Sequence, residues 1–199
     1  MISPESTLAE ILDHVWGMLI RGGADKKHAY HFPVLATFGT LGIEQRTVVL
    51  RQVKKETRHL ICYSDQRTRK VDDLQQKAAA HWLFYNHGSK EQIRAKVLIH
   101  LHHLDQEALK VWNEIPPSAR GDYVGPIPPG TRTSHYTDNL PNDFREEPTE
   151  DNTKEGFENF VLIASEVKQL DFLKLSRAGH LRAQFTWNQN QWEGSWVAP

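Results

Sequence analysis

The sequence is poor in cysteine and in long apolar runs, and both shortages exclude classes of protein. A single cysteine, Cys62, among 199 residues excludes an internal disulfide and any zinc cluster built on several cysteines. Cys62 lies in the apolar run 60–63, which favours a buried, inert thiol over a reactive one. No apolar stretch approaches the roughly 18 residues that a membrane-spanning helix needs, and the N-terminus lacks a signal-peptide pattern. We therefore expect a cytoplasmic protein.

The chain also lacks an excess of charge of either sign. Its 24 Lys and Arg residues nearly balance its 25 Asp and Glu residues, which gives a formal net charge of −1. Any electropositive site must therefore be local rather than spread over the molecule. Apolar residues make up 39% of the chain and charged residues 25%, which is typical of a folded globule. Residues 1–199 fit a single domain.

Hydropathy patterns predict an N-terminal helix followed by many short strands. Ser3-Pro4-Glu5 has the features of a helix start, and apolar residues at helical spacing continue to Gly22-Gly23. Shorter helices are expected at 69–77 and after Asp105. Strands are expected at 32–38, 46–53, 59–63, 80–85, 92–104, 160–167, 170–175, 181–187 and 192–197. Without alternating β and α units, this pattern predicts a mainly β (α+β) fold, a small antiparallel barrel.

Residues 116–152 differ from the rest of the chain. Seven of the ten prolines lie between Pro116 and Pro148, and apolar periodicity is weak. Loops of this length within a compact domain are usually functional or disordered. Acidic residues are frequent between Asp138 and Glu158, where a solvated loop is the simplest interpretation. We therefore expect a long Pro-rich loop here.

The segment 44–70 is locally basic, with eight Lys or Arg residues against three acidic ones. It runs from a strand end at Tyr63-Ser64 into a helix start at Thr68-Arg69-Lys70. Free backbone N–H groups at a helix start, a hydroxyl and two cations suit a phosphate. For the last three residues alone, a solvated charged turn is the simpler alternative. Arg58 is expected on an exposed turn of the same segment.

Five short motifs follow one another along the chain. They are Arg46-Thr47-Val48-Val49-Leu50-Arg51, Tyr63-Ser64 with Thr68-Arg69-Lys70, Leu83-Phe84-Tyr85, Glu91-Gln92-Ile93-Arg94, and the C-terminal Gln169-Leu170-Asp171-Phe172 with His180-Leu181-Arg182. In this order they resemble the motifs of the pyridoxamine 5′-phosphate oxidase family, which are flavoproteins. The resemblance spans residues 32–199 and implies an FMN-binding split β-barrel with flanking helices, assembled as a homodimer with FMN at the interface.

The resemblance also implies a role for each matching position. The FMN phosphate would be held by Arg46, Thr68, Arg69 and Lys70. Main-chain groups of the strand Arg46, Thr47, Val48, Val49 and Leu50 would follow the isoalloxazine ring. Tyr63 and Ser64 would lie near the ribityl chain and phosphate, and Gln92 would reach the cofactor from the second subunit.

The chain departs from the family where the family binds its substrate phosphate. Val111, Ile115 and Ala119 replace a Tyr, Arg and Ser set, and Leu173 replaces a tryptophan expected on the flavin. An Arg-x-His-x-Arg pattern is replaced by His180, Arg182 and Gln184. These changes do not touch the residues expected to bind FMN, but they argue against the family's own substrate. Candidate substrate-binding residues are Arg51, His180 and Arg182, and no catalytic acid or base is identified.

We therefore expect an FMN-dependent oxidoreductase that acts on a small organic substrate. The alternative is a non-catalytic FMN carrier or sensor, which the missing substrate residues favour. A nucleic-acid-binding barrel using segment 44–70 is the third possibility, and the balanced charge argues against it. A metal site at His100, His102 and His103 is disfavoured because no carboxylate completes the set.

Overall fold

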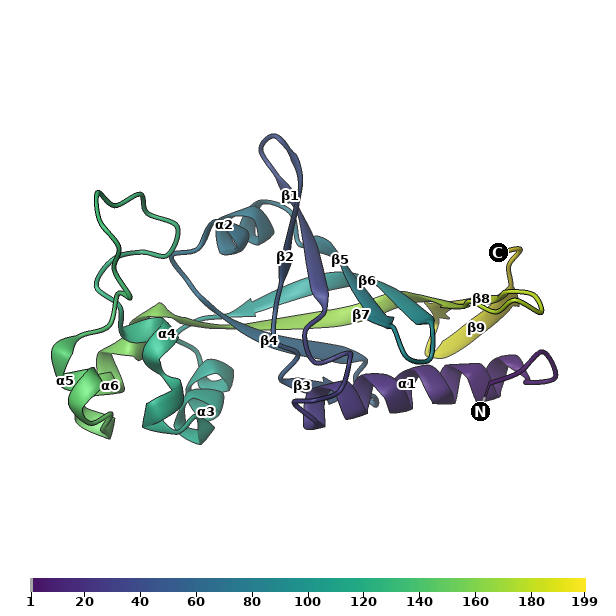
Figure 1. Cartoon of the computed structure of the whole chain (residues 1–199), viewed down its shortest axis with the longest axis horizontal. Coiled ribbons are helices and arrows are strands. Elements are labelled where there is room, and N and C mark those ends of the chain that lie inside the picture. Colours follow the sequence, from purple (N-terminus) through teal and green to yellow (C-terminus); the bar gives the residue numbers. More distant parts are fainter. Residues whose placement is uncertain (1) are drawn as a thin grey trace.

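The computed structural model describes residues 2–199, which form one antiparallel sheet with flanking helices (Figure 1). The strands are β1 Val34–Gly39, β2 Gly42–Thr47, β3 Gln52–Lys54, β4 His59–Asp65, β5 Ala79–Asn86, β6 Glu91–His102, β7 Phe160–Lys174, β8 Leu181–Asn188 and β9 Gln191–Trp196. Their order is β2-β1-β5-β6-β7-β4-β3, and the β8–β9 hairpin pairs with β7. The long strands β6 and β7 therefore form the centre of the sheet.

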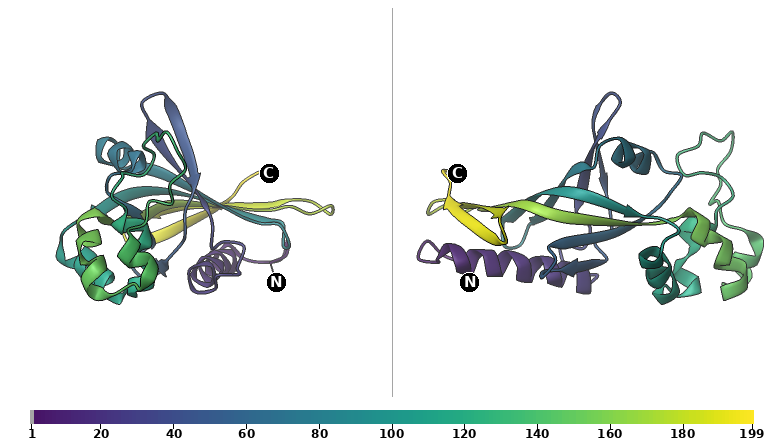
Figure 2. Two further views of the ribbon diagram at one scale, coloured as in Figure 1. Left: turned by 60° about the vertical axis from the view of Figure 1, so that its left-hand side comes forward. Right: turned by 180° about the vertical axis from the view of Figure 1, so that it is seen from behind.

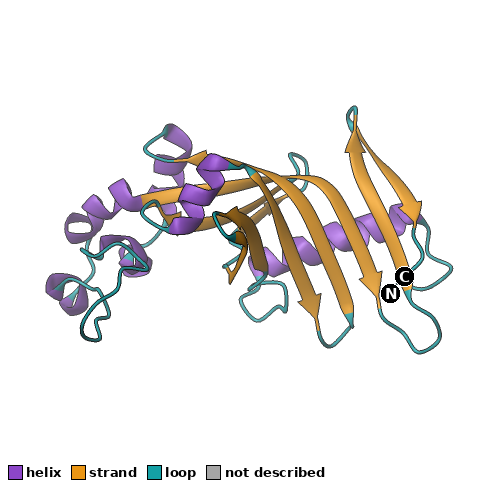
Figure 3. Cartoon of the chain, turned by 90° about the horizontal axis from the view of Figure 1, so that it is seen from above, coloured by secondary structure: helices purple, strands orange, loops and turns teal. Residues whose placement is uncertain are grey.

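The helix α1 (Leu8–Ala24) lies across one face of the sheet (Figure 3). Ile11, Val15 and Leu19 are buried against the main core, as their helical spacing predicts. The predicted start at Ser3 is wrong, because Thr7 is the N-cap and forms a capping box with Glu10. Residues 3–6 instead form a turn closed by a hydrogen bond from the amide of Ser6 to the carbonyl of Ser3.

Two strand predictions need correction. The two strands expected at 160–167 and 170–175 are the single strand β7, with a register shift opposite Lys96 and Val97 that leaves Lys168 unpaired with β6. A β-bulge accommodates one extra residue without ending the strand. The strand expected at 46–53 is interrupted, because β2 ends at Thr47 and β3 begins at Gln52. Residues between them bond elsewhere: the amide of Val48 donates to Pro33 and that of Leu50 to His31.

The remaining helices are short apart from two. They are α2 Arg69–Gln76, α3 Gln106–Glu114, η1 Pro117–Ala119, α4 Gly121–Val124, α5 Asn142–Glu146, α6 Glu150–Thr153 and η2 Lys154–Asn159. Asp105 caps α3 as predicted, since its side chain accepts from the amide of Ala108 at 2.8 Å. Residues 116–159 form a helical lobe at one end of the molecule, far from the C-terminal hairpin (Figure 2). The Pro-rich segment therefore contains short helices at its two ends, and residues 125–141 between α4 and α5 form a long loop without helix or strand.

One buried side chain, Arg120, organises this lobe. The residue is 1% exposed, and its guanidinium donates to the carbonyl of Trp112 at 3.2 Å, to Thr153 at 3.1 Å and to Glu150. The same guanidinium lies 4.6 Å from the ring centre of Trp112. A second small core of Ile61, Ala108, Trp112, Ile115, Tyr123, Phe160 and Leu162 joins the lobe to the sheet. Within residues 2–199, no helix is long and apolar enough to span a bilayer.

Candidate cofactor site

The connection between β4 and α2 builds a site with free hydrogen-bond donors. Thr68 is the N-cap of α2 in extended conformation, but its hydroxyl does not cap the helix. It donates instead to the carbonyl of Asp65 at 2.8 Å. Within residues 2–199 no acceptor is found for the amides of Arg69 and Lys70. Two N–H groups at the positive end of a helix are thus open to an anion.

Lys70 places an ammonium group next to these amides. Its Nζ donates to the hydroxyl of Ser64 at 2.7 Å and to that of Thr68 at 3.3 Å. Burial lowers the pKa of Lys70, and the nearby charge of Arg46 lowers it further. In the described residues no carboxylate comes within ion-pair distance of this ammonium. A half-buried cation held by neutral hydroxyls lacks charge compensation, which a bound phosphate would supply.

The two other predicted phosphate ligands differ in their surroundings. Arg46 on β2 is half-buried and donates to Thr37 at 2.7 Å, and burial lowers its pKa. Arg69 is exposed and donates to the hydroxyl of Thr40, in the β1–β2 turn, at 2.7 Å. The charge of Arg46 also lowers the pKa of Lys70, whereas Arg69 is exposed at the start of α2. The predicted role of each as a phosphate ligand stays a prediction.

The segment predicted to follow the flavin ring lies beside this site. Thr47 ends β2 and is exposed, and no hydrogen bond from the Val49 amide is found in residues 2–199. Arg51 stands over the Tyr63 ring, with 5.4 Å between the guanidinium carbon and the ring centre. Tyr63 packs against the second core, and successive side chains of a strand point to opposite faces, so this ring contact lies across β4 from the Ser64 hydroxyl that binds Lys70.

Three further predicted residues, Gln92, His180 and Arg182, form a second set. Gln92 lies on β6, His180 in the loop before β8, and Arg182 on β8. Gln92 pairs with Leu173, which pairs in turn with Arg182, so these positions form one row across three strands. His180 is exposed in the loop before β8, where its ring accepts from the amide of Ser176 at 3.1 Å. His180 and Arg182 together line a shallow hollow of about 350 Å³.

Sequence reasoning missed the residue that anchors this second set. Asp171 is 5% exposed and accepts from Arg94 and Arg182, each at 2.8 Å, and from Gln184 at 2.6 Å. These donors hold the pKa of Asp171 below its usual value against the opposing effect of burial. The sequence signal that could have indicated this residue is a lone acid within the otherwise apolar run 170–173. The group borders a cavity of about 180 Å³.

The two sets do not meet within one chain. The start of α2 and the strand β8 lie at different positions along the long axis of the molecule (Figure 1). Arg46, Ser64, Thr68 and Lys70 are therefore brought together, while Gln92, His180 and Arg182 lie elsewhere.

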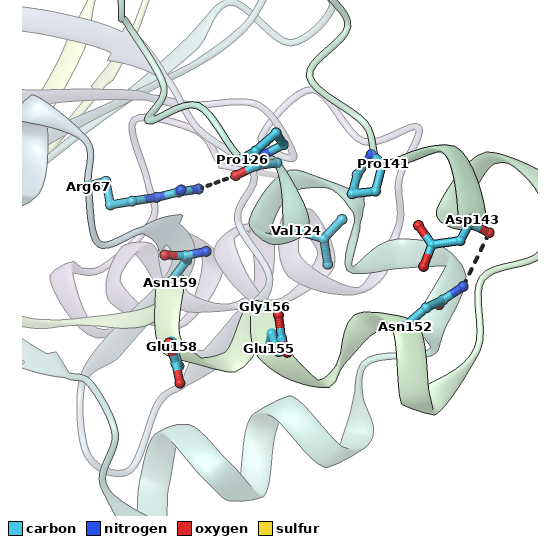
Figure 4. Close-up of a pocket in the computed structure, with 11 residues that line it drawn as sticks. Arg67, Val124, Pro126, Pro141, Asp143, Asn152, Glu155, Gly156, Glu158 and Asn159 are labelled. Atoms are coloured by element: carbon cyan, nitrogen blue, oxygen red, sulfur yellow. Dashed lines mark hydrogen bonds between the residues drawn. The ribbon is translucent and has the colours of Figure 1, made fainter.

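The positions that replace the family's substrate residues offer no polar group. Val111 packs beside the second core, Ile115 is buried within it, and Ala119 is exposed in η1. The nearby helical lobe encloses a separate pocket of about 360 Å³ lined by Asp143, Glu155 and Glu158 among others (Figure 4). Arg67 also lines it but is already bound to the carboxylate of Asp65 at 2.6 Å and to the carbonyl of Gly125 at 3.0 Å.

Arg58 lies in a turn between β3 and β4, as expected, but the expectation that it is exposed there is wrong. Its side chain is 16% exposed and donates to Glu166 at 2.6 Å. Its guanidinium also lies 3.9 Å from the centre of the Trp187 ring. Arg58 is thus part of the packing between β4, β7 and β8, which turn composition alone does not reveal.

The comparisons with known proteins agree with this fold. Residues 13–102 match the family model described as pyridoxamine 5′-phosphate oxidase, FMN-binding domain. No curated protein matches the chain. A pyridoxamine 5′-phosphate oxidase-related, FMN-binding protein from Nostoc punctiforme is similar over 100% of both chains, with 23% identity and a TM-score of 0.75. PhzG from Burkholderia lata, solved with tetrahydrophenazine-1-carboxylic acid, is similar over 99% of this chain and 95% of its own, with 17% identity and a TM-score of 0.67.

At these identities the solved structures establish the fold, and the family model covers the strands that carry the Lys70 site. The antiparallel sheet with flanking helices is the split barrel that the motifs predicted. Residues 13–102 are thus similar to a pyridoxamine 5′-phosphate oxidase FMN-binding domain, and the fold of the chain is that of such proteins.

Proposed function

We propose that the chain is an FMN-dependent oxidoreductase that acts on a small organic substrate. The observation that carries the proposal is the half-buried ammonium of Lys70, which is bonded only to the Ser64 and Thr68 hydroxyls beside two free helix amides. Such a set of donors fits a phosphate dianion better than a neutral group. The family-model match over residues 13–102 supports FMN as the molecule that bears this phosphate.

In this proposal the protein binds and orients the cofactor, and FMN supplies the electron transfer chemistry when it is bound. Lys70, Arg46 and the amides of residues 69–70 bind the phosphate. Thr47 to Leu50 follow the ring with their main chain, and Arg69 adds a second, more exposed cation. Because Gln92, His180 and Arg182 lie away from this site, we place them opposite the cofactor of a second copy. The working unit is then a homodimer with composite sites.

The substrate side is assigned to Arg51, His180 and Arg182. Val111, Ile115 and Ala119 offer no charge at the positions where the family binds a substrate phosphate, so the substrate differs from pyridoxamine 5′-phosphate. The same observation favours a second candidate function, a flavin carrier or sensor without turnover.

Two measurements test the proposal. The purified protein should be yellow and should release FMN, identified by mass spectrometry, when it is denatured. The bound flavin should then be reduced by an amine or a reduced pyridine nucleotide and reoxidised by air with repeated turnover. Colourless protein that takes up no FMN contradicts both functions, whereas bound FMN without turnover across such donors supports the carrier or sensor.

A further inference from the structure

Two buried polar side chains, Thr37 and Asp73, contact the guanidinium of Arg46 and have no part in the function proposed so far. Thr37 on β1 is fully buried, and Asp73 on α2 is 5% exposed. The hydroxyl of Thr37 donates to the Asp73 carboxylate at 3.1 Å. It accepts in return from Arg46 Nη1 at 2.7 Å, while Arg46 Nη2 lies 3.8 Å from the same carboxylate.

We propose that Thr37 and Asp73 are positioning residues that aim Arg46 at the cofactor phosphate and so set the preference of the site for phosphorylated flavin. This inference rests on the proposed FMN site. A threonine hydroxyl has one hydrogen to donate, and here Asp73 takes it. The oxygen of Thr37 can therefore only accept from Arg46, which fixes the direction of the bond and holds one side of the guanidinium.

The hydrogen bonds of Arg46 leave donors of its guanidinium other than Nη1 available for a phosphate. Its Nη1 group is used by Thr37 and, at 3.4 Å, by the carbonyl of Leu35. A guanidinium carries five N–H donors in a fixed plane, so donors remain for a phosphate. Arg46 also lies 3.8 Å from Asp73, which is one helical turn after Lys70 on α2, and the charge of Arg46 lowers the pKa of Lys70.

The distance between Arg46 and Asp73 matters for the charge of the site. A direct, bidentate carboxylate would neutralise the guanidinium and compete with a phosphate for its donors. Here the hydroxyl of Thr37 lies between the two groups, and the closest charged atoms stay 3.8 Å apart. The pair thus orients Arg46 without a close carboxylate contact on its remaining donors.

A purely structural role is the alternative, because the same bonds connect the β1–β2 hairpin to α2. The two roles differ in what they change. Loss of a structural link lowers the unfolding temperature and affects all flavins alike. If Arg46 is no longer oriented toward the phosphate, FMN affinity falls and riboflavin affinity stays unchanged, since riboflavin has no phosphate to bind.

The test uses the full chain stripped of flavin, with Thr37→Val and Thr37→Ser as a matched pair. Valine keeps the shape and removes the hydroxyl, whereas serine restores it. FMN and riboflavin are titrated by flavin fluorescence, and thermal unfolding is followed without flavin. We expect Thr37→Val to weaken FMN binding about tenfold, the scale of one hydrogen bond to a charged group, with riboflavin unchanged. Thr37→Ser should stay near wild type, and Asp73→Ala should behave like Thr37→Val.

The outcomes distinguish failure of this inference from failure of the proposed FMN site on which it rests. Equal affinity of the wild type for FMN and riboflavin refutes the phosphate site itself. If the wild type prefers FMN and Lys70→Ala loses that preference while Thr37→Val keeps it, the positioning role is wrong. A parallel fall of both flavin affinities in Thr37→Val, or a failure of Thr37→Ser to restore FMN binding, also refutes it. Should Thr37→Val not fold, Thr37→Ala replaces it in the same comparison.

Discussion

The substitution Lys70→Ala probes the proposed phosphate site most sharply. It removes an ammonium that donates to Ser64 at 2.7 Å and to Thr68 at 3.3 Å. The two hydroxyls left behind lie 3.1 Å apart and both already donate toward the carbonyl of Asp65, so no buried polar group loses its only partner. Loss of the cation also relieves its repulsion by Arg46. The apoprotein should therefore unfold at nearly the wild-type temperature.

The effect on FMN follows from the bonds that Lys70 would make. An ammonium has three donors, of which Ser64 and Thr68 occupy two, so one remains for the phosphate. A hydrogen bond between charged groups contributes roughly 1.5–3 kcal/mol, which corresponds to a loss of affinity of about 10- to 150-fold. Riboflavin affinity should not change, because the substitution acts only on the phosphate.

The assay is fluorescence titration of apoprotein with FMN and riboflavin, and Lys54→Ala is the control. Lys54 is an exposed cation in the same basic segment, but it lies on β3 opposite His59, at the other end of β4 from Ser64. Arg58 is unsuitable because its removal would expose Glu166 and the Trp187 ring. Equal loss of FMN affinity in Lys54→Ala and Lys70→Ala would show that a diffuse positive field, and not this site, attracts the phosphate.

The remaining predictions concern pH, substrate, the thiol and the lobe. FMN affinity should increase as the pH rises through about 6, where a phosphate monoester gains its second charge. Affinity should decrease again as the pH rises further, and this loss should begin before pH 10.5, because burial lowers the pKa of Lys70 from that value. Titration at several pH values checks this, and riboflavin should show neither change. Oxidation of pyridoxamine 5′-phosphate should be negligible in a peroxide-release assay, and robust turnover at micromolar substrate would show that the segment after Asp105 is misaligned. The Cys62 thiol, whose pKa burial raises to about 12, should resist alkylation at pH 8 until the protein unfolds, as mass spectrometry can show. Arg120→Ala should cost about 1.5–3 kcal/mol by removing the buried hydrogen bonds that its guanidinium donates to Trp112 and Thr153, and should speed proteolysis within residues 116–159; unchanged cleavage would contradict its organising role.

Local patterns predicted much of the fold because each depends on neighbours in the sequence. The helix α2 and its buried Val71 and Leu74 follow from amphipathic spacing, and the cap of α3 follows from Asp105. The β8–β9 hairpin turns at Gln189 and Asn190, whose positive φ angles suit a tight two-residue turn. The convergence of Ser64, Thr68 and Lys70 was predictable for the same reason, since a strand end runs directly into a helix start.

Features that depend on distant contacts were not predictable from the sequence. Arg58 is a turn residue, but the burial of its side chain depends on Glu166 and Trp187, which β7 and β8 place beside it. The helical lobe is organised by Arg120, which contacts residues 8 to 33 positions away. The missed anchor Asp171 gains its donors only when three strands align in register.

Titration of the wild-type apoprotein with FMN and riboflavin tests the central claim most directly. The claim is that a phosphate binds the Lys70 ammonium and the free amides at the start of α2. The account predicts that FMN binds at least tenfold more tightly than riboflavin, as expected for one or more charge-assisted hydrogen bonds to the phosphate. Equal affinities for the two flavins, or no binding of either, would contradict it.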